Sequence, residues 1–326
     1  MTITTKALAD LAAQLPELQF SSDKDCAWPL SDLSQAYLDF YGINFAKEFT
    51  QVKHGFGCVF TEKFRIAAHY WLPVNPQGSL VIVHGYYDHV GIYDHVIRFA
   101  LTNNLAILAF DLPGHGLSSG EPAVIDSFND YADVLASLLV QSKKIFSQPM
   151  YAIGQSTGCA VILNYLWRYA LQKKEGEQFK KIVLCAPLIL PQGWRGLRMG
   201  NYLYMVLRHF IKKIKRGYAR SSHDQTFNDF IMQHDLLQAK YLSLRWLGAM
   251  KEWHRVFSKF EAQQKDVLLL QGTDDMTVDW RYNVPLIQTK LPNLTLVTIA
   301  GAKHQLVNES ETYRAQVFSA IQHYFI

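Results

Sequence analysis

The sequence lacks any apolar run long enough to cross a bilayer. Its most apolar tract, Ile182–Pro191, has about half of the roughly 18 residues that a transmembrane helix needs. The first ten residues contain no basic cluster, and Asp10 interrupts the apolar stretch near the N-terminus. We therefore expect a soluble protein without an export signal.

Cysteines are also few, and their spacing excludes a disulfide framework. None of the four, Cys26, Cys58, Cys159 and Cys185, forms a Cys-x-x-Cys pair. Three of them lie in apolar segments, where a reduced, buried thiol is expected. The histidines lack the paired spacing of metal ligands. The sequence thus predicts a cytoplasmic protein with no metal site.

Neither sign of charge dominates the whole chain. Its 326 residues are 49% hydrophobic, with 32 Lys and Arg against 28 Asp and Glu, a net charge of +4. This composition excludes disordered and fibrous classes and gives no reason to expect a polyanionic partner. Residues 191–260, however, hold 13 basic and 4 acidic side chains, whereas the remainder holds 19 and 24. One segment therefore carries all the positive excess.

From residue 79 onward, short β-branched runs alternate with longer amphipathic stretches, which predicts parallel strands joined by helices. The runs are nearly continuously apolar, as expected of strands covered on both faces. The expected strands are Leu80–Val83, Leu105–Phe110, Met150–Ile153, Lys181–Cys185, Val267–Leu270 and Leu294–Ile299. The expected helices are Tyr93–Asn104, Phe128–Phe146, Thr157–Lys173, Trp280–Lys290 and Ser310–Phe325.

Three further segments complete the predicted organisation. Residues 1–50 indicate a helical extension, and Val52–Leu72 indicates one or two antiparallel strands at the edge of the sheet. Roughly 80 helix-like residues then separate two strands, which is too long for a plain loop. We therefore predict an α/β core at 51–187 and 265–326, interrupted by a helical cap at 188–264.

A Gly-x-Ser-x-Gly motif, Gly154 to Gly158, joins an expected strand to an expected helix. In a nucleophile elbow, the residues two before and two after the serine must be small because the turn is tight. Such a turn lifts the Ser156 hydroxyl above the sheet at a helix N-terminus, which favours negative charge. Ser156 is therefore the candidate nucleophile; a helix N-cap serine is the alternative.

A serine nucleophile needs a base that is itself oriented by an acid. The chain order serine, acid, histidine places these groups in loops after later strands, at the carboxyl edge where open α/β sheets bind ligands. The candidate base is His304. The candidate acid is Asp275, with Asp274 as its competitor and Asp279 interpreted as a helix cap.

Five motifs in order resemble the α/β-hydrolase superfamily, specifically its capped serine hydrolases, which include monoacylglycerol lipases and bacterial lysophospholipases. The resemblance covers about residues 55–325. The motifs are His84-Gly-Tyr-Tyr-Asp-His89, Asp111-Leu-Pro-Gly-His-Gly-Leu-Ser118, Gly154-Gln-Ser-Thr-Gly158, Gln271-Gly-Thr-Asp-Asp275 and Gly301-Ala-Lys-His304.

This resemblance implies an α/β-hydrolase fold and a cofactor-free reaction. It favours Asp275 over Asp274, because the acid of the family is the third residue after the glycine. It also implies that the main-chain N–H groups of Tyr86 and Thr157 form the oxyanion hole, in which two preorganised donors stabilise the tetrahedral intermediate. The loop at Asp111 resembles a phosphate loop but lacks its third glycine and its acidic partner, so a dinucleotide site is not expected.

The cap is expected to contain a basic amphipathic helix. Leu203 to Ile214 form an apolar stripe, with lysines and arginines on other faces. Such a helix could rest on the inner face of a membrane, or it could be a lid packed on the core with solvated lysines. The aromatic residues of the cap are interpreted as walls of an apolar pocket rather than as a nucleic-acid surface.

The sequence therefore predicts a serine carboxylic-ester hydrolase that acts on a single-chain acyl lipid, either a monoacylglycerol or a lysophospholipid. An aminopeptidase or a small-ester esterase of the same fold is the enzymatic alternative. A catalytically silent module that binds a membrane or a partner is the alternative from a different class.

Overall fold

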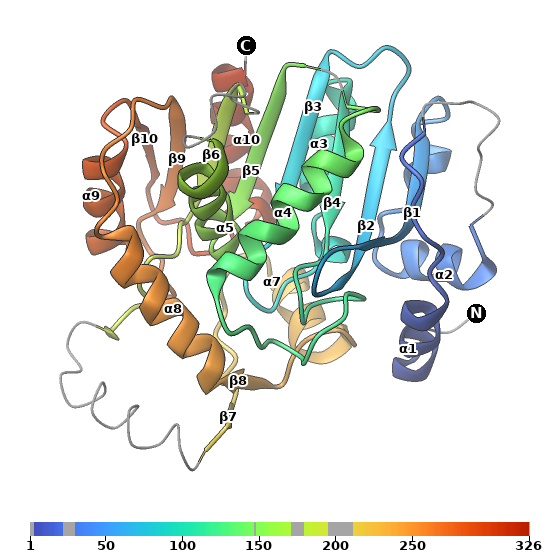
Figure 1. Ribbon diagram of the computed structural model, residues 1–326, viewed down its shortest axis with the longest axis horizontal. Helices are drawn as coiled ribbons and strands as arrows, with labels where there is room; N and C mark the ends of the chain where they lie inside the picture. The colour runs from blue at the N-terminus through green and yellow to red at the C-terminus, as the bar shows by residue number, and fades with distance from the viewer. Residues whose placement is uncertain (1–2, 22–29, 147, 171–178, 195–210, 326) are drawn as a thin grey trace.

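The computed structural model describes residues 3–21, 30–146, 148–170, 179–194 and 211–325. Its centre is an eight-stranded sheet in the order β1-β2-β4-β3-β5-β6-β9-β10 (Figure 1). The strands are β1 (Lys53–Phe60), β2 (Arg65–Leu72), β3 (Gly78–Val83), β4 (Leu105–Phe110), β5 (Met150–Gln155), β6 (Lys181–Cys185), β9 (Val267–Gly272) and β10 (Thr295–Ile299).

The sheet is parallel from β4 to β10, and β1 and β2 are antiparallel at one end. Alternate residues of the central strands supply two apolar clusters. Leu80 and Ile82 belong to one cluster, whereas Val81 and Val83 belong to the other. Successive side chains of a strand point to opposite faces, so each strand of a sheet that is covered on both faces has a continuously apolar sequence. The predicted fold class and the predicted edge strands are confirmed.

Helices cover both faces of the sheet. In Figure 1, α4 and α5 lie in front of the sheet, and α3 and α10 lie behind it. The core helices are α3 (Asp94–Thr102), α4 (Phe128–Ser142), α5 (Thr157–Tyr165), α9 (Trp280–Lys290) and α10 (Glu311–Phe325), with short turns η2 (Val90–Ile92), η3 (Leu166–Ala170) and η6 (Leu306–Asn308). Both α4 and α5 end earlier than predicted. The end of α5 is the point where the chain passes into the π-helical turn η3.

The extension, residues 1–50, contains more than the expected helices α1 (Thr5–Gln14), α2 (Asp32–Phe40) and η1 (Phe45–Lys47). Between α1 and α2 the chain pairs with the outer edge of β1. The Leu18 N–H donates to the Cys58 carbonyl, and the Cys58 N–H donates to the Pro16 carbonyl, both at 2.7 Å. The extension therefore covers an edge strand that would otherwise expose unpaired backbone groups.

The stretch at 188–264 is called the cap segment below. Its described elements are β7 (Lys213–Lys215), α7 (Gln225–Asp229), η5 (Phe230–His234), β8 (Tyr241–Ser243) and α8 (Leu244–Phe257). Of these, α7, β7 and β8 lie beyond the carboxyl ends of the central strands (Figure 1). The division into extension, core and cap stays a prediction.

The prediction of a basic helix in the cap segment is wrong for the part of that helix that the structure describes. Residues 203–210 lie outside the described residues, but Lys213–Lys215 form β7 and pair antiparallel with β8. Ile214 lies opposite Leu242 in this two-stranded sheet. Backbone pairing between segments nearly 30 residues apart thus overrides a local apolar spacing that is typical of a helix.

Two expectations about the chemistry of the chain can be compared with the structure. Cys58, Cys159 and Cys185 are buried free thiols, as predicted, and Cys26 lies outside the described residues. Within the described ranges, no helix is both long and apolar enough to span a bilayer.

The first prediction concerns α10, which packs on the sheet through the fully buried Val317 and Ile321. Replacing Ile321 by Ala leaves a cavity in a close-packed core, so the free energy of unfolding should fall by about 2 to 5 kcal/mol. Urea unfolding followed by circular dichroism measures this change. Ser319→Ala on the exposed side of the same helix is the control, and an equal effect of both variants would contradict the packing described here.

Candidate active site

Ser156 lies at a strained turn between β5 and α5. Its backbone angles are φ 55° and ψ −111°, a conformation that costs free energy for a residue with a side chain. Gly154 and Gly158 make the turn possible. A Cβ on Gly158 would lie 2.0 Å from the Val83 carbonyl oxygen, and a Cβ on Gly154 would lie 2.7 Å from the Cys159 nitrogen. The strand and the helix therefore approach too closely for any other residue.

Asp275 and His304 form a buried pair at the carboxyl ends of β9 and β10. Nδ1 of His304 donates to Oδ2 of Asp275 at 2.8 Å, and both residues are at most 5% exposed. Burial lowers the pKa of His304, but the Asp275 carboxylate outweighs it and raises this pKa above the ordinary value. For Asp275 the effects have the opposite sign. Burial raises its pKa, but His304 and two backbone N–H donors outweigh burial, so the pKa lies below the ordinary value.

The Asp275 carboxylate is fixed on both of its oxygens. Oδ1 accepts from the N–H groups of Thr277 and Val278, at 2.8 and 3.1 Å. Oδ2 accepts from Nε2 of Gln271 at 3.1 Å as well as from His304. This carboxylate can therefore hold one orientation of the imidazole and one tautomer.

The structure does not bring the two other candidate acids to His304. Asp274 is exposed, and its carboxylate lies 3.3 Å from the Thr273 hydroxyl. Asp279 is the N-cap residue of α9, as expected, but its side chain makes no capping hydrogen bond to that helix.

His304 is held beside the serine turn by the residue that precedes the serine. Nε2 of Gln155 donates to the His304 carbonyl at 2.8 Å, across 149 residues of sequence. Among the described residues, the Ser156 hydroxyl has no hydrogen bond to His304. In enzymes without bound substrate, such contacts are often long and shorten only when substrate binds.

The loop after β3 lies against the same turn, because a Cβ on Gly85 would lie 3.4 Å from the Ser156 Cβ. His84 shapes this loop. Its Nδ1–H donates to the Gly85 carbonyl, and its Nε2 accepts from the Leu112 N–H, each at 2.8 Å. Burial lowers the pKa of His84, so the neutral ring keeps both bonds.

The main-chain N–H groups of this loop differ in whether they are already used. The Gly85 N–H donates to the Asp88 carboxylate at 3.2 Å and to the Tyr93 hydroxyl at 3.0 Å. The N–H groups of Tyr86 and of Thr157, the first residue of α5, have no acceptor within the described part of the chain. Two N–H groups beside Ser156 are thus available to an external oxygen atom.

Asp88 and Gln305 join this loop to the histidine loop, and neither was assigned a role from the sequence. Nε2 of Gln305 donates to both oxygens of Asp88, at 3.1 and 3.2 Å, and the Tyr93 hydroxyl donates to Oδ2 at 2.9 Å. The two partners lie 217 residues apart, so no local sequence pattern could have indicated the contact. Gln305 directly follows His304, and the contact therefore helps to place the base.

The loop at Asp111 is structural rather than a phosphate site. Its two carboxylate oxygens accept from the N–H groups of Val90 and Leu117, both at 2.8 Å. A Cβ on Gly116 would lie 2.1 Å from Oδ2 of Asp111, so the glycine makes room for this carboxylate. His115 is buried and packs beside His84 and Tyr86.

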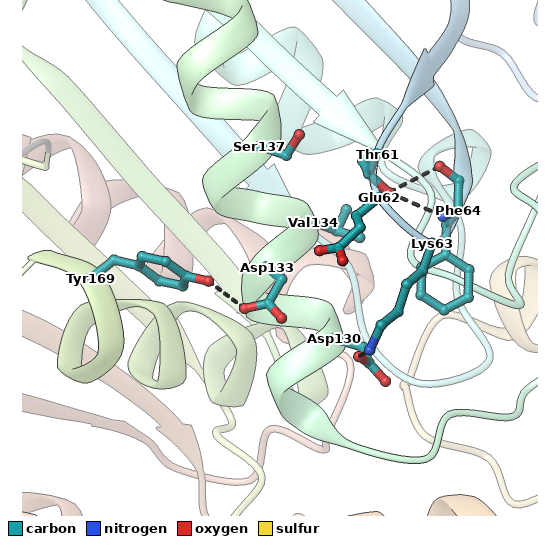
Figure 2. Close-up of a pocket in the computed structure, with 9 residues that line it drawn as sticks. All are labelled: Thr61, Glu62, Lys63, Phe64, Asp130, Asp133, Val134, Ser137 and Tyr169. Atoms are coloured by element: carbon teal, nitrogen blue, oxygen red, sulfur yellow. Dashed lines mark hydrogen bonds and ion pairs between the residues drawn. The ribbon is translucent and has the colours of Figure 1, made fainter.

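A surface pocket of about 300 Å³ lies away from these residues (Figure 2). It is lined by the turn between β1 and β2 together with α4 and η3, and none of the five predicted site residues borders it. Asp130 is paired with Lys63 at 2.6 Å, and Asp133 accepts from Arg168 and from the Tyr169 hydroxyl. Its acidic side chains are thus largely occupied. Across the described residues, no group of three or more His, Cys, Asp or Glu could hold a metal ion.

The chain is similar to known proteins over most of its length. Human monoglyceride lipase is 27% identical over 77% of this chain and 84% of its own length. Phospholipase YtpA of Bacillus subtilis is 24% identical over 77% of this chain and 95% of its own. A soluble variant of monoglyceride lipase from Saccharomyces cerevisiae superposes with a TM-score of 0.69 at 19% identity, covering 82% of this chain and 93% of the yeast chain.

The yeast structure shares the α/β-hydrolase fold, with the same arrangement of a mostly parallel sheet between helices. The family model described as "Serine aminopeptidase, S33" matches residues 74–311, which include the serine turn, Asp275 and His304. Because this match covers well over half of the chain, the protein belongs to the Hydrolase_4 family of α/β-hydrolases.

Proposed function

We propose that this protein is a serine hydrolase that cleaves the carboxylic ester of single-chain acyl lipids through an acyl-enzyme. The observation that carries this proposal is the buried Asp275–His304 pair beside the strained Ser156 turn, with two unoccupied N–H groups next to the serine. A nucleophile, an oriented base and two oxyanion donors are the parts that acyl transfer requires.

In the acylation step, the Ser156 hydroxyl attacks the ester carbonyl while Nε2 of His304 accepts its proton. The positive imidazole is stabilised by Asp275 through the Nδ1–H bond of 2.8 Å. The N–H groups of Tyr86 and Thr157 donate to the oxyanion of the tetrahedral intermediate, and each such donor is worth on the order of 3 kcal/mol. The C–O bond to the alcohol then breaks, and His304 returns the proton to the leaving oxygen.

In the deacylation step, a water molecule takes the place of the alcohol. His304 accepts a proton from this water, whose oxygen attacks the acyl carbonyl, and the second tetrahedral intermediate uses the same two N–H donors. Collapse of the intermediate releases the fatty acid, and His304 protonates the serine oxygen. No step requires a cofactor.

The substrate class is supported by the names of the relatives, which include monoglyceride lipases and a phospholipase. An aminopeptidase, the alternative that the family description names, needs a free carboxylate for the amine of its substrate. The two buried acids near the loop after β3 are not free. Asp88 accepts from Gly85, Tyr93 and Gln305, and Asp235 accepts from His89, Tyr41 and Gln238. These contacts favour the ester hydrolase.

The second prediction tests the nucleophile. Ser156→Ala removes the attacking oxygen, so release of fatty acid from a monoacylglycerol and from a lysophospholipid should fall by about 10⁴-fold or more. Titration of the released acid measures both rates. Ser137→Ala, in the pocket of Figure 2, is the matched control and should retain full activity. Full activity of Ser156→Ala would disprove the proposed mechanism.

The third prediction concerns pH. His304 must be neutral to accept a proton, and its pKa lies above the ordinary value of 6.5, so kcat/KM should rise with pH with a midpoint above 6.5. In Asp275→Asn the effect of the carboxylate is lost while burial remains, so the midpoint should fall and kcat should drop by about 10⁴-fold. A pH–rate profile of both proteins measures this shift. An unchanged midpoint in the variant would contradict the assigned pair.

We further infer that the protein works in the cytoplasm and binds anionic membranes peripherally through the cap segment. Ile211, Ile214 and Tyr241 are 39%, 43% and 52% exposed. Lys212 and Lys215, which are also exposed, directly follow the two isoleucines in the sequence. Two other cations of the segment are paired with core acids, Lys213 with Glu121 at 2.9 Å and Arg245 with Asp126. Within the described ranges, Lys212 and Lys215 form no ion pair, and exposed apolar side chains near such lysines suit an anionic lipid surface.

The fourth prediction tests this surface. Because each lysine near an anionic membrane contributes about 1 kcal/mol, the double variant K212Q/K215Q should bind phosphatidylglycerol vesicles roughly 10- to 30-fold more weakly. Vesicle sedimentation measures the affinity, with phosphatidylcholine vesicles for comparison. The control K143Q/K144Q removes two exposed lysines after α4, at the opposite edge of the sheet. Equal weakening by both pairs would refute a specific surface.

A further inference from the structure

Arg216 of the cap segment lies directly on the loop that follows β3. Its guanidinium carbon is 3.8 Å from the centre of the Tyr87 ring and 4.6 Å from that of Tyr218, so two aromatic rings lie against it. One nitrogen, Nη1, donates to Oε1 of Gln238. The Nε2 of Gln238 in turn donates to the Tyr87 carbonyl at 3.0 Å. Arg216 is thus fixed next to Tyr86, whose N–H is a proposed oxyanion donor.

Within the described residues, no carboxylate forms an ion pair with Arg216. Two other arginines of the cap segment differ in this respect, since Arg245 pairs with Asp126 and Arg255 pairs with Glu252. A half-buried cation without an ion-pair partner is costly. A guanidinium has five N–H donors, of which one is used on Gln238, and its flat fork suits the oxygens of a phosphate.

The position of Arg216 relative to the reaction follows from the proposed mechanism. His304 must protonate the alcohol oxygen, so the alcohol half of the ester lies on the side of His304. The residue after His304, Gln305, donates to Asp88, and Asp88 directly follows Tyr87, the residue whose ring Arg216 contacts. Arg216 therefore borders the side of the site to which the head group of the lipid must extend.

We propose that Arg216 binds the phosphate of the substrate head group and thereby selects lysophospholipids over monoacylglycerols. The inference rests on the proposed ester hydrolysis and adds the head group to it. Water cleaves the acyl C–O bond and yields a fatty acid and a glycerophosphodiester, while the phosphodiester itself stays intact. Charge-assisted bonds from a planar guanidinium supply both affinity and orientation.

The experiment compares two short-chain, monodisperse substrates, an octanoyl lysophosphatidylglycerol and an octanoyl monoacylglycerol, so that membrane binding plays no part. In Arg216→Gln, the ratio of kcat/KM for the phospholipid to that for the monoacylglycerol should fall about tenfold or more, mainly through KM. Arg216→Lys keeps the charge but loses the fork, so it should recover only part of the ratio. The matched control Arg220→Gln removes an exposed arginine four residues away and should leave the ratio unchanged.

An ether-linked octyl lysophosphatidylglycerol, which the enzyme cannot cleave, adds a binding measurement. It should inhibit monoacylglycerol hydrolysis by the wild-type protein competitively, and about tenfold less strongly in Arg216→Gln. Equal losses on both substrates, with unchanged inhibition, would show that Arg216 only supports the loop and would overturn the proposal. Cleavage of neither substrate by the wild-type protein would instead refute the proposed function itself. Thermal unfolding confirms that each variant is folded.

Discussion

The arrangement of the site depends on the close approach of α5 to the strands behind it. Gly158 lies against the Val83 carbonyl, and Ser156, two residues earlier, has the positive φ of a left-handed turn. The same approach brings the start of α5 beside the loop that follows β3. The nucleophile and the N–H donors are therefore not positioned independently, because one steric contact between helix and strand places both. The surrounding fold holds the strained backbone of the serine in place.

Buried carboxylates then assemble the loops around this turn. Asp111, Asp88 and Glu309 are each at most 5% exposed, and each accepts backbone N–H groups. Glu309 accepts from the N–H groups of Lys303 and His223, both at 2.8 Å, and so joins the histidine loop to the cap segment. A carboxylate has about four acceptor positions, so one buried side chain can satisfy several donors from irregular backbone. These acids organise the carboxyl edge of the sheet where no regular ladder of hydrogen bonds exists.

The parts that could be predicted from the sequence are those with local causes. Continuous apolar runs predicted the strands, and the spacing of Gly154 and Gly158 predicted the turn at Ser156. By contrast, the contacts of Asp88 with Gln305 could not be predicted, because they depend on which loops the fold brings together. Strand β7 was missed for a similar reason: its apolar spacing favoured a helix, but its partner strand β8 lies in another part of the sequence.

Asp235 links the cap segment to two other parts of the chain. Its carboxylate accepts from the Tyr41 hydroxyl of the extension at 2.9 Å and from Nε2 of His89, in the loop beside the serine, at 3.0 Å. Separating the cap segment from the core at this margin would break the buried pair of Asp235 and His89, at a cost of several kcal/mol. Through Tyr41, the extension therefore contributes to holding this margin of the cap segment against the core.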